Sequence, residues 1–379
     1  MTDAALDTLI DRVRAARADK TPLNILGGST KAFYGEPPSA RPGLAALDIR
    51  PLAGISSYEP SELVVTVRAG TPLAELEAAL AEQRQCLPFE PPRFTSPNAA
   101  GGTVGGMVAA GLAGPARAAV GGLRDYVLGA TLLTGQAELL TFGGQVMKNV
   151  AGYDVSRLLA GSMGMLGVVC EVSLKVLPLA VATATLRFEQ DEDSALKQLN
   201  TWGGQPLPVN ASAWWDGMLV LRLSGAAAAV QSAIQKLGGE RVDPVLAANF
   251  WTGLRDQTDE FFTKAQVAVD AGATLWRLAL PQTAPPLALA GEHLVEWGGA
   301  QRWVVTTTPA GAVRDAAARA GGHATVFRSS RPGSAGAAAG FDGPRFAPLS
   351  APLMRIHLAL KTAFDPDHLF NPGRLYAGL

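Results

Sequence analysis

The stretch GGTVGGMVAAGLAG, residues 101–114, contains six glycines among otherwise small or aliphatic residues. Such a run keeps side chains away from the backbone, so the first question is which molecule the backbone must approach closely. A Rossmann loop requires the spacing G-x-G-x-x-G, and a phosphate-binding P-loop requires G-x-x-x-x-G followed by Lys. Residues 101–114 have neither the first spacing nor a following lysine, so neither nucleotide motif explains this run.

Two further glycine-rich loops occur in the same part of the chain. LGGSTKAFYG follows the predicted strand 23–26, and its successive N–H groups could form a concave nest for a pyrophosphate or simply a tight turn. In GSMGMLG, residues 161–167, a glycine occurs at every third position before an apolar strand, which suits either a flat ligand or a compact turn. Three such loops without a metal-binding Cys or His spacing favour one large ligand held mostly by backbone groups.

Composition limits the class of protein. A chain of 379 residues favours two domains, and a net charge of −1 without a long basic tract argues against nucleic acid as the main partner. The two cysteines, Cys86 and Cys170, indicate a reducing compartment. The polar first twenty residues predict an amphipathic helix rather than a signal peptide, and no apolar run is long enough for a membrane span. We therefore expect a cytoplasmic protein.

Three zones follow one another along the chain. In residues 1–178 we predict strands over 23–26, 62–70 and 167–178, a hairpin over 129–144, and a helix after Thr71, which could cap it. Residues 179–340 contain all seven tryptophans and predict an α+β domain with an antiparallel sheet. Residues 341–379 predict a helix with an apolar stripe of Leu353, Ile356 and Leu360, and a tail that packs back on the first domain.

The order of motifs resembles a known family. The chain contains, in this order, GGSTKAFYG, VVTVRAGTPLAELEAAL, GGTVGGMVAAG and KNVAGYDVSRLLAGSMGMLGVVCEVSLKVLP. This order resembles that of the vanillyl-alcohol oxidase and p-cresol methylhydroxylase (PCMH-type) flavoproteins. Within that superfamily the chain is most similar to FAD-binding subunits of glycolate oxidase, the GlcE type. The resemblance covers residues 22–178 and 350–379, whereas the middle domain matches only in order and size.

This resemblance implies an α+β fold with a two-part PCMH-type FAD-binding domain (1–178), a cap or substrate-side α+β domain with an antiparallel sheet (179–340), and a C-terminal helix and tail (341–379). It implies that the first loop holds the FAD pyrophosphate, that the second lies against FAD, and that the third contacts FAD through its main chain, with the C-terminal turn returning to the flavin region. The implied contacts are Gly27, Gly28, Ser29, Thr30, Thr103, Gly105, Gly106, Gly161, Ser162, Gly164, Gly167, Val168, Val169 and Asn371. Since the glycine loops lack the His or Cys of covalently flavinylated relatives, we expect non-covalent FAD. Backbone N–H groups could replace a cationic phosphate clamp.

A catalytic base is not visible in the sequence. Related stand-alone dehydrogenases, and the sister subunit of glycolate oxidase, carry an H-x-G-D-G-N-x-H segment, which this chain lacks among its four histidines. Lys148 and Arg374 are candidates for binding a substrate carboxylate, although a structural role for Lys148 is at least as well supported. In a stand-alone dehydrogenase, Lys148 or Tyr153 would be candidates for the base. We predict no metal site.

The resulting hypothesis is an FAD-dependent oxidoreductase, specifically the FAD-binding subunit of a multi-subunit 2-hydroxyacid (glycolate) oxidase that takes part in electron transfer during oxidation of glycolate to glyoxylate. Expected partners are a sister FAD-binding catalytic subunit, an iron–sulfur subunit and a small 2-hydroxy acid, with no nucleic acid. The expected location is cytoplasmic, with membrane association through the complex left open. Two alternatives remain: a stand-alone FAD-dependent 2-hydroxyacid or alcohol dehydrogenase, and a non-catalytic assembly subunit that retains the fold.

Overall fold

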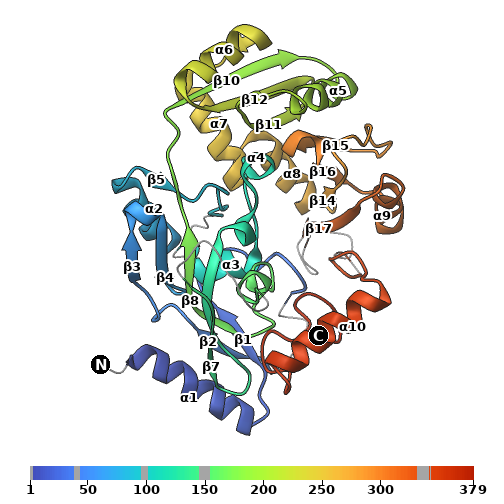
Figure 1. The fold of residues 1–379 in the computed structure, drawn as a ribbon. Coiled ribbons are helices and arrows are strands. Elements are labelled where there is room, and N and C mark those ends of the chain that lie inside the picture. The colour runs from blue at the N-terminus through green and yellow to red at the C-terminus, as the bar shows by residue number, and fades with distance from the viewer. Residues whose placement is uncertain (1–2, 38–42, 95–100, 145–153, 331–340, 342) are drawn as a thin grey trace. The chain divides into compact units, whose positions relative to one another are not determined.

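The computed structural model describes residues 3–37, 43–94, 101–144, 154–330, 341 and 343–379 (Figure 1). Its contacts divide the chain into two compact units. Unit 1 comprises Met1–Leu112, Gly122–Pro178 and Pro348–Leu379, and unit 2 comprises Ala113–Gly121 and Leu179–Ala347. The domain boundaries predicted at residues 178 and 340 stay a prediction, and the two units are described separately below.

A five-stranded antiparallel sheet forms the centre of unit 1. Its strand order is β3-β4-β8-β6-β7. The bounds are β3 Ile55–Glu59, β4 Val64–Arg68, β6 Val127–Leu133, β7 Leu139–Gly143 and β8 Val168–Lys175. The inner strands β4 and β8 are rich in β-branched valine, which suits a buried pleated surface, and Val65, Val67 and Val172 have no exposed area. The predicted strands 62–70 and 167–178 and the hairpin 129–144 are thereby confirmed.

The segments around this sheet carry the loops of interest. They are α1 Ala4–Ala18, β1 Leu23–Leu26, β2 Ala45–Asp48, α2 Leu73–Glu82, β5 Gln85–Cys86, α3 Val104–Ala110, β9 Leu177–Pro178 and α10 Ala351–Phe364. Strand β1 pairs in parallel with β2, while β5 pairs with β9. The expectation that Thr71 caps α2 is wrong. Its hydroxyl instead accepts a hydrogen bond from Gly54 N and donates one to Gly54 O. The N-cap residue of α2 is Pro72, which provides no side-chain cap.

The C-terminal helix α10 forms as predicted, but its apolar stripe does not turn inward. Leu353 and Ile356 are 47% and 55% exposed, respectively, while Leu360, the third residue of the stripe, is half-buried. The one buried residue of α10 is Lys361, in the last turn of the helix. The helix therefore meets the rest of unit 1 through a buried cation near its C-terminal end, which hydrophobic periodicity cannot predict.

Unit 2 is built on one eight-stranded antiparallel sheet, as the α+β prediction for this part of the chain requires. The strand order is β13-β10-β12-β11-β15-β16-β14-β17. The strands are β10 Ala182–Glu189, β11 Val209–Trp215, β12 Met218–Gly225, β13 Glu240–Arg241, β14 Thr274–Ala279, β15 Glu292–Glu296, β16 Gln301–Thr306 and β17 His323–Ser329. The helices are α4 Arg117–Val120, α5 Glu192–Gly203, α6 Ala227–Leu237, α7 Pro244–Asp256, α8 Glu260–Asp270 and α9 Ala310–Arg319.

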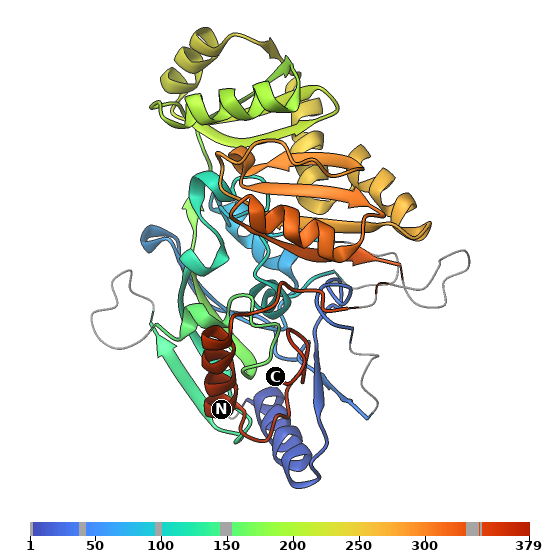
Figure 2. The same cartoon turned by 90° about the vertical axis from the view of Figure 1, so that its right-hand side faces the viewer.

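Helices cover both faces of this sheet. Alternating leucines of β12, Leu219, Leu221 and Leu223, form a core with α5 and α6. At the other end of the sheet Trp276 and Val304 pack with residues of α9, which lies in front of the strands in Figure 2 while α8 lies behind them. Period-two burial along the strands thus produces two apolar faces, each of which a helix layer covers.

Candidate cofactor site

The first glycine loop leaves β1 with unused hydrogen-bond donors. On the edge of β1 that faces away from β2, Leu23 N donates to Leu369 O (2.7 Å) and Ile25 N donates to Asn371 Oδ1 (2.9 Å). The next four N–H groups, those of residues 27–30, donate no hydrogen bond to any residue that the structure describes. Ser29 adopts φ +54°, so the chain curls at this point. Successive unused N–H groups in such a curl form an anion-binding nest.

The first loop packs so closely against the second glycine run that Gly27 and Gly28 have no room for a side chain. A Cβ on Gly28 would lie 1.7 Å from Gly101 O, and one on Gly27 would lie 2.4 Å from Thr103 Oγ1. Thr103 caps α3, since its Oγ1 accepts a hydrogen bond from Gly106 N (3.2 Å). The first loop and the second glycine run are therefore in direct contact, and only residues without side chains permit this approach.

The second glycine run begins α3. A Cβ on Gly105 would lie 2.8 Å from the Ala69 side chain, so the glycine makes room for the neighbouring chain at that point. Gly106 and the small residues Ala109 and Ala110 face a cavity bordered by β1 and its loop. Gly105 therefore both lines the cavity and makes room for the packing of α3 against Ala69.

The third loop, residues 161–167, lies against α3. Gly161 N donates to Val108 O (2.9 Å) and Met163 N donates to Ala109 O (2.8 Å). Gly164 and Gly167 have φ of +71° and +151°, in the region that favours glycine. These glycines allow the chain to turn tightly before it enters β8.

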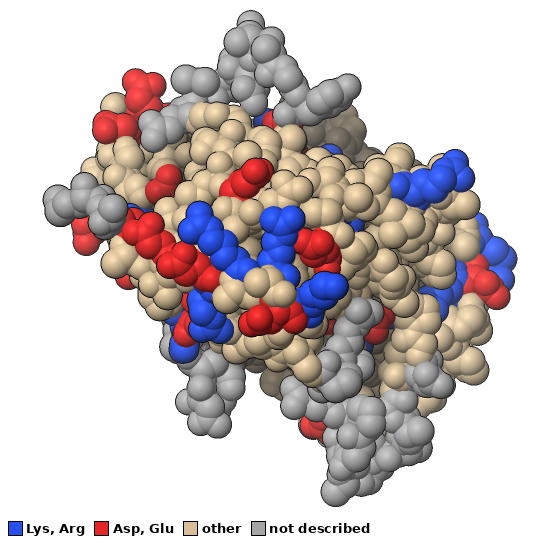
Figure 3. Space-filling model, turned by 90° about the horizontal axis from the view of Figure 1, so that it is seen from below, with Lys and Arg blue, Asp and Glu red and all other residues tan. Residues whose placement is uncertain are grey.

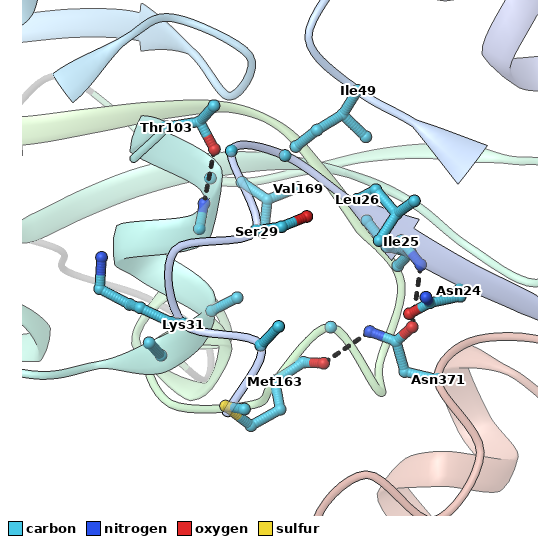
Figure 4. Close-up of a pocket in the computed structure, with 18 of the residues that line it drawn as sticks. Asn24, Ile25, Leu26, Ser29, Lys31, Ile49, Thr103, Met163, Val169 and Asn371 are labelled. Carbon is cyan, nitrogen blue, oxygen red and sulfur yellow. Dashed lines mark hydrogen bonds between the residues drawn. The ribbon is translucent and has the colours of Figure 1, made fainter. Parts of the chain in front are cut away.

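Asn371 joins this third loop to the first. Its Nδ2 donates to Met163 O (2.7 Å) while its Oδ1 accepts from Ile25 N (2.9 Å). Figure 4 shows this side chain between the two segments, with both hydrogen bonds. Asn371 is 9% exposed, so a residue far along the chain fixes the separation of the two loops.

These segments enclose one cavity in unit 1. Twelve residues singled out from the sequence line it: Gly27, Gly28, Ser29, Thr30, Thr103, Gly105, Gly106, Gly164, Gly167, Val169, Asn371 and Arg374. Gly161, Ser162 and Val168 do not line it. Ser162 is buried and Val168 has no exposed area, so both support the wall from behind. Lys148 and Tyr153 lie outside the described residues, and the part of each lining residue in ligand binding stays a prediction.

Several lining residues were missed in the sequence. Lys31 belongs to the loop LGGSTK that was already selected, so reading that loop to its end would have found it. Ile49 and Met163 also line the cavity. Ile49 carries no motif; parallel pairing places it there, since Leu26 faces Asp48 in the ladder and Ile49 N donates to Leu26 O (2.9 Å).

Lys31 and Arg374 are the cationic residues among those found to line the cavity. Lys31 Nζ lies 5.6 Å from the centre of the Phe94 ring. Arg374 donates from its guanidinium to Ala32 O (2.7 Å) and to Glu36 O, both in the segment that follows the first loop. Arg374 therefore anchors that segment, which favours a structural role over its suggested role in holding a substrate carboxylate.

The donor set fits the diphosphate of FAD. The nest supplies backbone N–H groups, Lys31 and Arg374 supply positive charge, and no Asp or Glu is among the residues found to line the cavity. Ile49, Val169 and Met163 add apolar wall suited to a flat ring system. Across the described part of the chain, no group of three or more His, Cys, Asp or Glu could hold a metal ion.

Comparison with known proteins identifies the family. Residues 4–143 match the model of an FAD binding domain. The chain is 47% identical over 371 residues to the glycolate oxidase subunit GlcE of Escherichia coli, an alignment that covers 98% of this chain and 97% of that protein. The chain belongs to the GlcE family of glycolate oxidase subunits.

GlcE-family membership places the chain among FAD-binding oxidoreductases of the PCMH type. A more distant relative is the glycolate oxidase subunit GlcD of Bacillus subtilis, 29% identical over 44% of this chain and 34% of that protein. Among solved structures, an alkyldihydroxyacetonephosphate synthase superposes with a TM-score of 0.61 at 15% identity, covering 97% of this chain and 76% of that one. This likeness confirms the predicted fold for a GlcE-family chain. Among the described residues, no helix has both the length and the apolar composition to cross a membrane.

Proposed function

We propose that this chain binds FAD non-covalently as a subunit of a multi-subunit 2-hydroxyacid (glycolate) oxidase. In that assembly it transfers electrons between its flavin and an iron–sulfur subunit, while a sister flavoprotein oxidises glycolate to glyoxylate. The observation that carries the proposal is the nest of unused N–H groups at residues 27–30, at a cavity whose described wall contains cations and no carboxylate. The near full-length similarity to a glycolate oxidase subunit supplies the proposed setting.

FAD, when bound, supplies a ring system that accepts and releases electrons. The residues of this chain bind and orient it. The N–H groups of residues 27–30 would donate hydrogen bonds to the pyrophosphate, and Lys31 would partly neutralise its charge. Met163, Val169 and Ile49 would exclude water from the ring system. Asn371 holds β1 and the third loop together through its bonds with Ile25 N and Met163 O.

Non-covalent attachment agrees with the chemistry of the cavity wall. The residues known to line it include no His and no Cys. Burial raises the pKa of the Cys86 thiol to about 11 and that of Cys170 to about 12, so neither supplies a thiolate at neutral pH. We therefore expect acid denaturation to release the flavin from the protein.

The proposed partners follow from what the chain lacks in its own sequence. Two cysteines are too few for an iron–sulfur cluster, which usually takes four, so a cluster would have to reside on another subunit. On the face seen in Figure 3, basic and acidic side chains lie beside one another, which supports partners other than nucleic acid. A cytoplasmic location, with membrane association through the complex, is part of the proposal.

Reconstitution tests the cofactor half of the proposal. We expect the purified chain to bind added FAD with quenching of flavin fluorescence and to release unmodified FAD after acid precipitation. A chain that shows no bound flavin after reconstitution would contradict the proposal. Flavin that stays with the acid-precipitated protein would contradict non-covalent attachment alone.

Activity measurements and co-purification test the proposal that the chain works as one subunit of a larger oxidase. We expect glycolate to leave the flavin of the isolated chain unbleached under anaerobic conditions, because no catalytic base was found in its sequence. The chain should co-purify from its host with a second flavoprotein and an iron–sulfur protein, and that assembly should oxidise glycolate. Turnover by the isolated chain at the rate of the assembly would favour a stand-alone dehydrogenase.

A further inference from the structure

One ion pair of unit 1 is almost completely shielded from solvent. Lys361 is 1% exposed, and Asp365, one helical turn later, has no exposed area. Lys361 Nζ donates to Asp365 Oδ2 (2.6 Å), to Met165 O (2.7 Å) and to Phe370 O (2.8 Å). An ammonium group has three N–H donors, so all of them are used.

The carboxylate of this pair is equally well satisfied. Asp365 Oδ1 accepts from Leu369 N (3.0 Å) and Oδ2 accepts from Phe370 N (2.8 Å). Gly135 lies so close that a Cβ there would be 2.3 Å from Asp365 Oδ1. Burial lowers the pKa of Lys361, and Asp365 opposes that shift. Burying two charges is costly unless both are hydrogen-bonded, as they are here, and removal of one partner would leave an uncompensated buried charge.

The Lys361–Asp365 pair contacts two segments that carry loops of the cofactor cavity, namely the third loop and the segment paired with β1. Met165 lies in the third loop, between the lining residues Gly164 and Gly167. Phe370 forms a bridge with Leu23 of β1, the strand that delivers the 27–30 nest. Its neighbour Asn371 bonds to Ile25 N and to Met163 O. The Lys361–Asp365 pair thus fixes the two main-chain segments from which the nest and the third loop extend.

We propose that Lys361 and Asp365 are positioning residues for the cofactor, which hold the third loop and β1 at the separation that binds FAD. This inference rests on the proposed function, because it assumes that the cavity takes FAD. Neither side chain touches the cofactor. The ammonium acts through Met165 O and Phe370 O, and the carboxylate acts through the amides of Leu369 and Phe370.

Two variants and a matched control separate positioning from a general contribution to stability. Lys361→Met removes all three donors and leaves Asp365 buried without its cation. Lys361→Met/Asp365→Asn removes the charge imbalance but still leaves Met165 O and Phe370 O without a donor. The control is Lys197→Met on α5, which makes the same chemical change in an i,i+4 Lys–Asp pair with Asp193 whose Lys side chain is 74% exposed.

The full-length chain is titrated with FAD at a temperature where circular dichroism shows each variant folded. We expect the FAD Kd to rise at least tenfold in the single and in the double variant, and to stay within twofold of wild type in Lys197→Met. The double variant should regain thermal stability relative to Lys361→Met without regaining FAD affinity. A double variant with wild-type Kd overturns the inference, even if its melting temperature is lowered.

Hydrogen exchange measured by mass spectrometry gives a readout that needs no cofactor. We expect the hydrogen-bonded amides of residues 161–163 and of strand β1, residues 24–26, to exchange at least tenfold faster in the double variant, with α5 unchanged. Equal exchange in these segments overturns the positioning role. If wild type binds no FAD, the proposed function fails on the titration, and exchange alone decides whether the pair fixes the loops.

Discussion

At the scale of single residues, the walls of the cavity depend on glycines, whose lack of a Cβ atom lets two backbone segments come into contact. Gly28 and Gly101 stack backbone on backbone, as do Gly111 and Gly161, where a Cβ on Gly111 would lie 2.8 Å from Gly161 Cα. A side chain at such a contact could be accommodated only by movement of the main chain, because the opposing atom belongs to the backbone. Side chains then complete the site from a distance, as Asn371 does with its two amide atoms.

Gly28→Ala is the sharpest test at this scale. The added methyl would lie 1.7 Å from Gly101 O, so one of the two loops must move. We expect a loss of stability of about 1–3 kcal/mol, as for other overpacking substitutions, and a rise of at least tenfold in the FAD Kd. Thermal melting and flavin fluorescence titration measure the two effects.

Gly311→Ala on α9 provides the matched control. A Cβ at this position meets nothing within 4 Å. Since alanine is the better helix former, we expect a gain of about 0.5–1 kcal/mol and an unchanged FAD Kd. Wild-type FAD affinity in Gly28→Ala would show that the loop contact has no part in binding.

The sequence could predict those parts of the site that lie within a single motif or next to a predicted strand. The nest residues 27–30 and the small residues of α3 stand in glycine motifs, and the predicted strands at 23–26 and 167–178 place them correctly. Ile49 and Lys361 could not be found that way, because parallel pairing and a buried ion pair bring them into position from distant segments. The side chains of Leu353 and Ile356 show the opposite case. The helix that their spacing predicts does form, but both side chains stay exposed in it.

At the scale of elements, two helices of unit 2 begin with an aspartate whose pKa departs from its usual value in opposite directions. Asp259 caps α8 by accepting a bond from Phe262 N (3.3 Å), and burial raises its pKa from 3.8 to about 6. Asp191 caps α5 with bonds from Ser194, which lower its pKa. The same type of cap therefore has opposite effects on stability as the pH changes.

The substitution Asp259→Asn should raise the free energy of unfolding at neutral pH and leave it nearly unchanged at acidic pH. Because the raised pKa disfavours the ionised carboxyl in the folded protein, Asp259 lowers stability above about pH 6, and this loss disappears as the pH falls to about 4. Asparagine is also a good cap, so removal of the charge should gain up to about 3 kcal/mol above pH 6. Urea unfolding of wild type and variant at pH 4 and pH 7 measures the difference.

Asp191→Asn is the control with the opposite sign. Its lowered pKa means that the ionised form stabilises the fold at neutral pH, so the variant should be less stable than wild type there and should converge with it as the pH falls through the folded pKa. If both variants respond to pH in the same direction, burial is not the cause of the Asp259 shift.

At the scale of the whole molecule, the chain carries a separate intrinsic probe in each unit. Both cysteines belong to unit 1, and Cys170 is 3% exposed with its pKa raised. All seven tryptophans belong to unit 2: Trp202, Trp214, Trp215, Trp251, Trp276, Trp297 and Trp303. Labelling of the buried Cys170 thiol therefore reports the unfolding of unit 1, and indole fluorescence reports that of unit 2.

FAD should shift the first of these probes. A ligand at 100 times its Kd adds about 2.7 kcal/mol to the unit that binds it. We expect FAD to raise the urea concentration at the midpoint of thiol labelling accordingly. The midpoint of the tryptophan fluorescence transition should rise as well only if the two units unfold together. Gly28→Ala should lose the shift. If saturating FAD leaves the labelling midpoint of the wild-type chain unchanged, the cofactor does not bind in unit 1.

The bond between Ile25 N and the Asn371 side chain spans 346 positions of the sequence. During synthesis, the strand that begins the cofactor loop leaves the ribosome long before the residues that hold it in place. A nascent chain that stops at residue 360 would carry all three glycine loops, but neither Lys361 nor Asn371 to fix them. We therefore expect flavin loading to wait until translation of this segment is complete, so that products of premature termination before it stay colourless.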